Sequence, residues 1–291
     1  MSAANFELLR ERATWIRTET VRLIEIAKSG HYTSVFSAAE LFATLYYHTM
    51  RLNDDPKWPE RDRLILSKGH CAVGIYPVLA DKGYFPKEWL DTYALIGSPL
   101  GDHPDMTKVP GIDFSSGSLG HGLSIGLGMA LGLRRRPPFN GRHGRAYVIL
   151  GDGELNEGQI WEAAQAAGHY QAGNLIGIID RNGMGLDGRT EDTMRIEPLA
   201  DKWRAFNWNV QEVDGHDLQA LVQLFDSLDP NADKPQMIIA HTIKGKGVTW
   251  MENSRVWHLG YLAGVDARRT IDDIKQYSWN DSTVATASER N

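Results

Sequence analysis

The stretch AYVILGDGELNEG (residues 146–158) joins a short apolar run to a glycine-rich turn, and LIGIIDRNGMGLDG (residues 175–188) repeats that arrangement. Each apolar run predicts a buried strand, and residues 158–171 between them predict a helix. A strand, a helix and a second strand form a right-handed βαβ unit, so the two strands should be near neighbours in a parallel sheet. Asp152 and Asn182 each follow the carboxyl end of a strand, so we expect both side chains in the same crevice.

The rest of the chain continues this alternation of strands and helices. Strands are expected at 63–67, 146–150, 175–180, 209–213 and 236–241, and helices at 5–28, 37–50, 71–82, 121–136, 158–171, 197–206 and 217–228. In the helix at 37–50, Ser37 should be the N-cap and Glu40 should complete a capping box. Strands that are apolar throughout are typical of a parallel sheet covered on both faces. The expected fold class is therefore α/β, a parallel sheet with helices on both faces, in one domain at 1–281 with a polar tail at 282–291.

Composition and charge argue against several classes of function. The 291 residues are 42% hydrophobic, which is ample for a packed core, and the net charge of −6 argues against nucleic-acid binding. Net charge does not exclude a local anion pocket. The one cysteine, Cys71, cannot form an internal disulfide, so we expect a core residue in a cytoplasmic protein. No apolar run approaches the roughly 18 residues that span a membrane, and the N-terminal residues lack the apolar segment of a signal peptide.

The residues after the two strands suit a metal-bound diphosphate. The side chains of Asp152 and Asn182, with a backbone carbonyl, are hard oxygen ligands for Mg²⁺, which completes its shell with phosphate oxygens and water. Gly151 and Gly153 let the backbone approach an anion closely. The alternative is that both turns are only tight connections, since Asp-Gly turns are common. The sequence has no GxxxxGK[ST] motif, and GSLGHG (117–122) follows no good strand, which argues against a P-loop and a Rossmann site.

The combined motifs resemble a known family. GDG followed about thirty residues later by the Asn of RNG is similar to the thiamine diphosphate motif, and the neighbouring segments resemble the transketolase family. The matching segments, in the family's order, are SGH (29–31), DRLILSKGH (62–70), GDHPDM (101–106), GSLGHGLSIGLGMA (117–130), GDGELNEGQIWEA (151–163), DRNGMGLDG (180–188), VDGHD (213–217) and TIKGKG (242–247). The resemblance covers about residues 8–275 and only the N-terminal, diphosphate-binding half, as in split transketolases. It implies a thiamine-diphosphate-binding fold of the PP type.

The resemblance also implies how the cofactor is held. Asp152, Asn182 and the carbonyl of Met184 match the residues that bind Mg²⁺, or another divalent cation, in the family. The N–H of Gly153 matches the group that meets the diphosphate.

A second segment matches the loop over the thiamine rings. Gly117, Ser118 and Leu119 occupy that loop, where Pro is more usual than Ser, although split forms accept Ser. Glu157 matches a carboxylate at the family's subunit contact. A solvated acid favoured by the helix dipole is an equally good interpretation of Glu157.

Four histidines match positions at which the family binds substrate and cofactor: His31, His70, His103 and His258. Imidazole suits such positions because its pKa lies near the working pH. The resemblance implies that His258 and His31 assist proton transfer and that His103 holds hydroxyls of the donor. It further implies that His70 and His258 contact the cofactor.

Other histidines and lysines allow a plainer interpretation. We expect His169 and His216 to be structural. Lys244 and Lys246 either neutralise a nearby anion or are solvated loop charges, and the sequence favours neither.

Three residues depart from the family's pattern. Tyr32 follows His31 where Pro is common, His121 replaces a usual Gln, and Leu259 follows His258 where Gly is common. Tyr32 and His121 are candidates for reshaping the substrate side. We therefore expect a donor other than an ordinary sugar phosphate, such as a branched or otherwise modified ketose.

The resemblance finally implies a partner. In the family, a carboxylate from a pyrimidine-binding domain activates the cofactor, and the residues after 270 are too few to form such a domain. We therefore expect a second subunit that carries this domain, in an α2β2 heterotetramer that is active only when assembled. The expected reaction transfers a two-carbon ketol unit from a ketose, or its phosphate, to an aldose. Alternatives are half of a deoxyxylulose-phosphate synthase, a 2-oxoacid dehydrogenase, or a non-catalytic cofactor-binding subunit.

Overall fold

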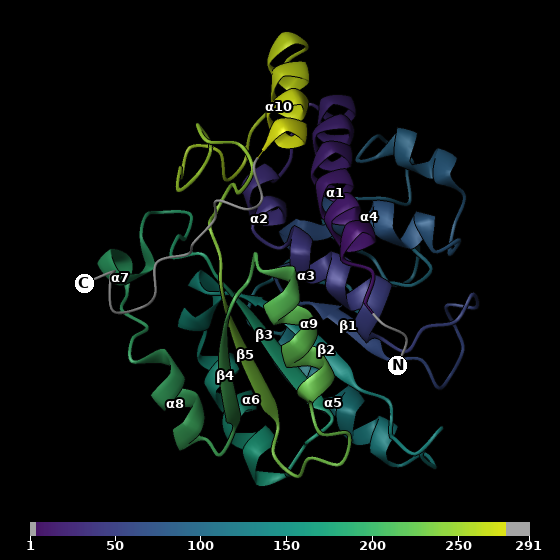
Figure 1. The fold of residues 1–291 in the computed structure, drawn as a ribbon, viewed down its shortest axis with the longest axis vertical. Coiled ribbons are helices and arrows are strands. Elements are labelled where there is room, and N and C mark those ends of the chain that lie inside the picture. Colours follow the sequence, from purple (N-terminus) through teal and green to yellow (C-terminus); the bar gives the residue numbers. More distant parts are fainter. Residues whose placement is uncertain (1–3, 278–291) are drawn as a thin grey trace.

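Five parallel strands form the centre of the computed structural model, which describes residues 4–277 (Figure 1). The strands are β1 (Arg63–Leu66), β2 (Ala146–Gly151), β3 (Leu175–Arg181), β4 (Asn209–Asp214) and β5 (Gln236–His241), and they lie in the order β1-β2-β3-β5-β4. The two strands of the expected βαβ unit are adjacent, with Gly151 paired to Asp180 at their carboxyl ends. The expected parallel α/β sheet is therefore confirmed.

Helices cover both faces of this sheet. The α-helices of the described residues are α1 (Phe6–Ala27), α2 (Tyr32–Phe36), α3 (Ala39–Thr44), α4 (Ala72–Asp81), α5 (Gly122–Arg134), α6 (Gly158–His169), α7 (Thr190–Thr193), α8 (Leu199–Ala205), α9 (Leu218–Ser227) and α10 (Val265–Gln276). Val148 and Ile179 belong to a buried cluster with residues of α5, α6 and α8. Tyr147 and Ile178, which point to the opposite face, belong to a cluster with residues of α1, α3, α4 and α9. Burial on both faces explains why β2, β3 and β5 are mostly apolar, whereas the edge strand β4 is more polar and only partly buried.

The expected capping box is wrong. The segment at 37–50 is divided into α3, which begins after Ala38, and a π-helical turn at Leu45–Thr49. The Ser37 hydroxyl donates a hydrogen bond to the Asp180 carboxylate at 2.6 Å rather than capping a helix. Glu40 binds Arg17 and His216. Partners distant in the sequence therefore replace the local contacts on which the prediction rested.

Further features of the described residues bear on the sequence predictions. Helix α10, which the sequence pattern did not predict, packs beside α1 (Figure 1). The expected core position of Cys71 is confirmed, since its thiol is buried and donates to the Ser34 carbonyl at 3.1 Å. Within residues 4–277, no helix is long and apolar enough to cross a bilayer. The expected tail at 282–291 lies outside the described residues, and the domain boundary at 281 stays a prediction.

Candidate active site

A cavity of about 330 Å³ opens at the carboxyl ends of β1, β2 and β3. The expected site residues that line it are His31, His70, His103, Gly117, Leu119, Asp152, Gly153, Asn182, Met184 and His258. Ser118 lies between two lining residues but is exposed and is not part of the lining. A second cavity of about 460 Å³, beside α6 and α8, contains none of the expected residues. The residues that the sequence grouped by motif thus share one site.

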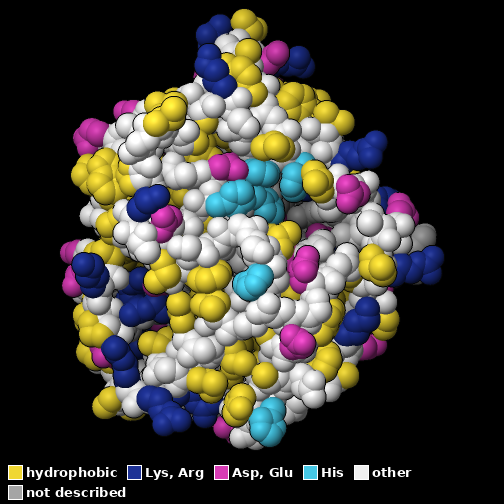
Figure 2. All heavy atoms as spheres, turned by 180° about the vertical axis from the view of Figure 1, so that it is seen from behind, with side chains coloured by type: hydrophobic (Ala, Val, Ile, Leu, Met, Phe, Trp, Pro, Cys, Tyr) yellow, Lys and Arg dark blue, Asp and Glu magenta, His cyan; other side chains and the backbone are white. Residues whose placement is uncertain are grey.

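The histidine wall, which we define as His31, His70, His103 and His258, gathers around one point. The ring centre of His31 lies 5.2 Å from that of His70, 5.3 Å from that of His258 and 6.1 Å from that of His103. Figure 2 shows histidine side chains clustered at a hollow on this face of the molecule. These residues come from four segments of the chain, so tertiary packing alone brings them together.

A short backbone bridge explains how two of these segments meet. Gly30 and Gly260 exchange N–H···O hydrogen bonds of 3.1 and 3.0 Å, which places His31 beside the segment that carries His258. A Cβ on Gly30 would lie 2.5 Å from the Ile24 side chain, so the close packing there requires glycine. The Thr33 hydroxyl adds a third link by donating to the Trp257 carbonyl at 3.1 Å.

Burial and lysine charges keep two of the histidines neutral. Burial, together with Lys244 and His31, lowers the pKa of His258 to about 3. Burial and Lys68 likewise lower the pKa of His70 well below its ordinary value. The Lys244 amine lies 2.9 Å from Nδ1 of His258. When this lysine is protonated it donates to Nδ1, which leaves the ring proton of His258 on Nε2.

Asp102 is a residue that sequence reasoning did not single out. Its carboxylate lies 3.4 Å from Nδ1 of His31 and 3.6 Å from Nδ1 of His103. The first contact is not aligned as a hydrogen bond, because Nδ1 of His31 is buried without a hydrogen-bond partner among the described residues. Tyr93 donates to Asp102 at 3.0 Å and so fixes the carboxylate between the two rings. The carboxylate thus places a negative charge beside both imidazole rings without a hydrogen bond to either among the described residues.

The strand-end floor, which we define as Lys68, Asp152, Asp180 and Asn182, lies at the carboxyl ends of β1, β2 and β3, and all of its residues except Asp180 line the cavity. Asp180 is fully buried and forms an ion pair with Lys68, which follows β1. Taking two charges out of water costs several kcal/mol for each ion unless further hydrogen bonds compensate. Here Ser37 and Thr242 both donate to Asp180. The sequence contains the buried lysine and aspartate, but nothing local indicates that they pair.

Asp180 also orients Asn182. The amide nitrogen of Asn182 donates to the Asp180 carboxylate at 3.2 Å, and its amide oxygen accepts the N–H of Met184 at 3.1 Å. The amide oxygen therefore points away from Asp180, toward the turn that carries Met184. This orientation offers an oxygen, and not an N–H group, to a ligand.

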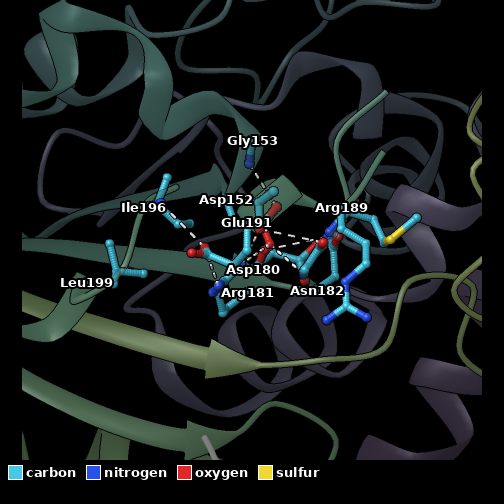
Figure 3. Close-up of polar contacts among 12 residues, drawn as sticks. Asp152, Gly153, Asp180, Arg181, Asn182, Arg189, Glu191, Ile196 and Leu199 are labelled. Atoms are coloured by element: carbon cyan, nitrogen blue, oxygen red, sulfur yellow. Dashed lines mark hydrogen bonds and ion pairs between the residues drawn. The ribbon is translucent and has the colours of Figure 1, made fainter. Parts of the chain in front are cut away.

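Asp152 is held by both turns and by an arginine. Its Oδ1 accepts the Gly153 N–H at 2.8 Å, while its Oδ2 accepts the Gly183 N–H and the Arg181 guanidinium, the latter at 3.1 Å (Figure 3). Burial raises the pKa of Asp152, and Arg181 opposes that rise. The paired arginine thus favours the charged form of a fully buried carboxylate.

Glu154 is another residue that the motif contained but that sequence reasoning did not single out. Its carboxylate accepts the Gly151 N–H at 3.0 Å and the Gly120 N–H at 2.9 Å, and it also binds Ser67. It therefore ties the turn after β2 to the loop at 117–122. One buried acid thus holds the turn that carries Asp152 against the loop that carries Gly117, Ser118 and Leu119.

The donor set fits a hard cation beside an anion. Among the described residues there is no group of three or more His, Cys, Asp or Glu side chains suited to a metal. The expected set has a single carboxylate, with an amide and a carbonyl oxygen, and all three residues line one cavity. A Cβ on Gly153 would lie 3.4 Å from the Gly185 backbone, so the two glycine turns approach each other closely. The two turns therefore lie in contact at the cavity lining.

Comparison with known proteins agrees with this geometry. Residues 9–287 match the family model described as transketolase, thiamine diphosphate binding domain. The chain belongs to the transketolase family. It is 40% identical over 277 residues to one subunit of the apulose-4-phosphate transketolase of Phocaeicola vulgatus, covering 95% of this chain and 96% of that protein. It is 44% identical over 251 residues to 6-deoxy-6-sulfo-D-fructose transketolase subunit SqwG of a Clostridium species, covering 86% and 90%.

Solved structures of transketolases share the fold. The Campylobacter jejuni enzyme superposes with a TM-score of 0.84 at 26% identity, covering 95% of this chain and 44% of that chain. The Pichia stipitis enzyme in complex with sedoheptulose-7-phosphate gives 0.83 at 29% identity, covering 96% and 42%. The chain thus spans less than half the length of these transketolases. The expectation of an N-terminal, thiamine diphosphate-binding transketolase subunit, with the matching α/β fold, is confirmed.

The structure also decides between interpretations that the sequence left open. Lys244 is 2% exposed and lines the cavity, so it is not a solvated loop charge. Lys246 is 1% exposed and packs its amine 5.1 Å from the Tyr277 ring centre, outside the cavity lining. His216 is structural, as expected, since it is buried between Glu40 and the Ile243 N–H.

The departures from the family's pattern lie outside the cavity lining. Tyr32 is fully buried in the core, and its hydroxyl accepts the Leu262 N–H at 3.0 Å. His121 is exposed at the start of α5, beside the carbonyl of Leu119 at 3.2 Å. Neither side chain lines the cavity of this chain, since Tyr32 packs into the core and His121 is exposed, and the expectation that they shape the substrate side stays a prediction. Leu259 is exposed beside His258 and also lies outside the lining.

Proposed function

We propose that this chain is the cofactor-binding subunit of a two-subunit transketolase. The observation that carries the proposal is a single cavity lined by Asp152, Asn182 and the histidine wall. A site with the diphosphate end alone would suit many thiamine diphosphate enzymes. The four histidines beside it suit a polyhydroxylated substrate, whose hydroxyl and carbonyl oxygens need several donors and acceptors.

The strand-end floor would hold Mg²⁺ and the diphosphate. Asp152, the amide oxygen of Asn182 and the carbonyl of Met184 would bind the cation, and the Gly153 N–H would meet the diphosphate. Gly117, Ser118 and Leu119 would lie along the thiamine rings, with Ser118 contributing its backbone because its side chain faces solvent. Bound thiamine diphosphate supplies the stabilised carbanion that two-carbon transfer requires.

The histidine wall would bind the sugar and move protons. His258 and His70 are neutral at neutral pH, so each can donate from one ring nitrogen and accept at the other. His258, with its proton on Nε2, would donate to a sugar oxygen, and His31 would accept a proton at Nε2 while Asp102 faces its Nδ1. His103, more exposed than His31, would hold hydroxyls of the donor at the mouth of the cavity.

The donor is proposed to be a ketose or ketose phosphate with an unusual end, and the acceptor an aldose. Two relatives are named for apulose-4-phosphate and for 6-deoxy-6-sulfo-D-fructose, which are not the ordinary sugar phosphates of the family. Identities of 40% and 44% to these proteins support the class of donor and do not select one.

A partner chain completes the proposal. Relatives of nearly the same length are named as subunits, and the longer transketolases contain more than twice this length of chain. We infer a second chain that carries the pyrimidine-binding domain, in an α2β2 assembly located in the cytoplasm.

Native mass spectrometry of the tagged chain, isolated from its own host with Mg²⁺ and thiamine diphosphate, tests the proposal. We expect a complex with a second chain, and ketol transfer only when both chains are present. Ketol transfer by this chain alone would contradict the assignment to a two-chain enzyme. A complex that binds no thiamine diphosphate would contradict the proposed function itself.

A further inference from the structure

Arg181 lies between Asp180 and Asn182 in the sequence, and its guanidinium binds both the strand-end floor and a segment outside it. Its Nη1 donates to Oδ2 of Asp152 at 3.1 Å and to the Thr190 hydroxyl at 2.7 Å, and its Nη2 lies 3.1 Å from carboxylate oxygens of both Glu191 and Glu197 (Figure 3). Both terminal nitrogens of the guanidinium therefore donate hydrogen bonds. It joins the turn after β2 to a segment that lies beyond β3 in the sequence.

That segment, residues 189–199, forms part of the cavity and depends on the same two glutamates. Thr190 and Thr193 line the cavity. Glu191 also accepts the Ile196 N–H at 3.3 Å, and Glu197 accepts the Leu199 N–H, the first of α8, at 2.7 Å. Each glutamate thus uses its carboxylate both to fold segment 189–199 and to bind Arg181. Removing the guanidinium would release the segment from the strand-end floor.

The same guanidinium restricts the orientation of the Asp152 carboxylate. Oδ2 of Asp152 accepts two donors, Arg181 and the Gly183 N–H, whereas Oδ1 accepts only the Gly153 N–H among the described residues. The carboxylate is thereby held in one orientation, with Oδ1 the less occupied oxygen. Three carboxylates surround the one guanidinium, so the cluster carries no net positive charge that would repel a cation.

We propose that Arg181 is a positioning residue that makes Asp152 and segment 189–199 a single unit. Loss of the guanidinium should therefore release the segment and weaken cation binding together. The inference rests on the proposed function, because Asp152 is there a ligand of Mg²⁺. Partners that orient a metal ligand typically account for roughly 10–100-fold in metal affinity, so the effect is large enough to measure.

The test uses the complex purified through a tag on this chain, with four variants. Mg²⁺ is titrated by calorimetry at saturating thiamine diphosphate, and hydrogen exchange of residues 189–199 is followed by mass spectrometry. Arg181→Gln and Glu197→Ala should each weaken Mg²⁺ binding, by about 10-fold and by a few-fold respectively. Both should speed exchange in the segment before any ligand is added, and excess Mg²⁺ should restore binding, which a misfolded protein would not show. Asp201→Asn, on α8 but paired with Arg204, is the matched control and should change neither measurement.

Arg181→Gln and Glu197→Ala change charge in opposite directions, which separates positioning from a simple field effect. The first makes the cluster more negative, and the second makes it more positive. Positioning predicts that both weaken Mg²⁺ binding, whereas a field effect predicts that Arg181→Gln strengthens it. Opposite directions, or unchanged exchange in residues 189–199, would overturn the inference while leaving the proposed function intact. If the unaltered complex and the fourth variant, Asp152→Ala, both fail to bind thiamine diphosphate with Mg²⁺, the proposed function fails and the inference falls with it.

Discussion

The strand-end floor and the histidine wall both contribute to one cavity but are built in different ways. The floor comes from residues at or just after the carboxyl ends of β1, β2 and β3, so the register of a parallel sheet places them together. The wall comes from four segments, two of which are joined by the bridge between Gly30 and Gly260. The floor therefore depends on the sheet, and the wall depends on loop packing.

The strand-end floor and the histidine wall also differ in the charge of their side chains. On the floor, charges are buried and compensated, as in the pair of Lys68 with Asp180 and the pair of Arg181 with Asp152. On the wall, burial and nearby lysines lower the pKa of His70 and His258, so these rings are neutral. Loss of a floor residue should therefore affect binding and stability, whereas loss of a wall residue should affect turnover.

The largest expected effect follows from Asp152→Ala. Loss of a ligand should cost more than loss of a partner that only orients one, so affinity for thiamine diphosphate in the presence of Mg²⁺ should fall by roughly 100-fold or more. Calorimetry on the purified complex measures this directly. Asp201→Ala, a substitution of the same type on the exposed part of α8, should leave the affinity unchanged. Retained Mg²⁺-dependent binding in Asp152→Ala would show that the cation is held elsewhere.

His31→Gln tests the role of the histidine wall. Loss of a general base typically costs about 10²–10⁴-fold in rate, so kcat of the reconstituted complex should fall by that order. Affinity for the cofactor should change by less than about threefold, because His31 makes no contact with the strand-end floor in the described hydrogen bonds. Steady-state kinetics and calorimetry on the same sample provide both numbers.

His216→Gln is the matched control for that variant. His216 is buried against Glu40 and outside the cavity, so its loss should lower the melting temperature and leave kcat unchanged. A fall in kcat of the same size in both variants would show that His31 acts through the fold rather than through substrate.

Asp180→Asn should weaken folding. The substitution leaves Lys68 buried without its counter-charge, which typically costs about 3–5 kcal/mol of the free energy of unfolding. The double variant Lys68→Met, Asp180→Leu should recover part of this loss, because it buries no unpaired charge. Urea unfolding of the three proteins measures the difference, and equal stability of Asp180→Asn and the unaltered chain would contradict the assignment.

The same pair makes a prediction about acid stability. The Lys68 ammonium and the hydrogen bonds of Ser37 and Thr242 lower the pKa of Asp180 against the opposing effect of burial. The stabilisation is therefore fully present above the ordinary aspartate pKa of 3.8 and is lost as the pH falls through the lower folded-state value. The acid limb of the unfolding curve should be shallower in Asp180→Asn than in the unaltered chain.

The difference between the strand-end floor and the histidine wall also explains which parts of the site the sequence predicts. The strands at β2 and β3 and the placing of Asp152 and Asn182 rest on local pattern, and the sheet confirms them. Two ion pairs beside them were missed, that of Arg181 with Asp152 and that of Lys68 with Asp180, because each joins residues far apart along the chain. The expected cap at Ser37 was wrong for the same reason.

The histidines could be grouped only through motif resemblance. No periodicity or spacing places His31 beside His258, which lies more than two hundred residues away in the sequence. Asp102 was missed although it lies in a quoted motif, because its importance depends on the two imidazoles that it faces. Local pattern thus predicts where a strand ends, and tertiary contacts decide which side chains work together there.

The smallest expected effect, a shift in a pH profile, tests why the histidine wall is neutral. Burial is the main cause of the low pKa of His258, and Lys244 is the next. Lys244→Met removes the positive charge but keeps the burial, so the pKa of His258 should rise from about 3 toward its ordinary value by roughly one unit. The acid limb of kcat/KM for the complex should move to higher pH by the same amount, since His258 would become protonated at a higher pH.

Lys246→Met removes a buried lysine from the same loop but outside the cavity lining, and its profile should match that of the unaltered complex. An acid limb unmoved by Lys244→Met would mean that burial alone keeps His258 neutral, or that another group sets the limb. In that case Lys244 would not be a cause of the neutral histidine wall, and only the compensation of charges on the strand-end floor would remain established.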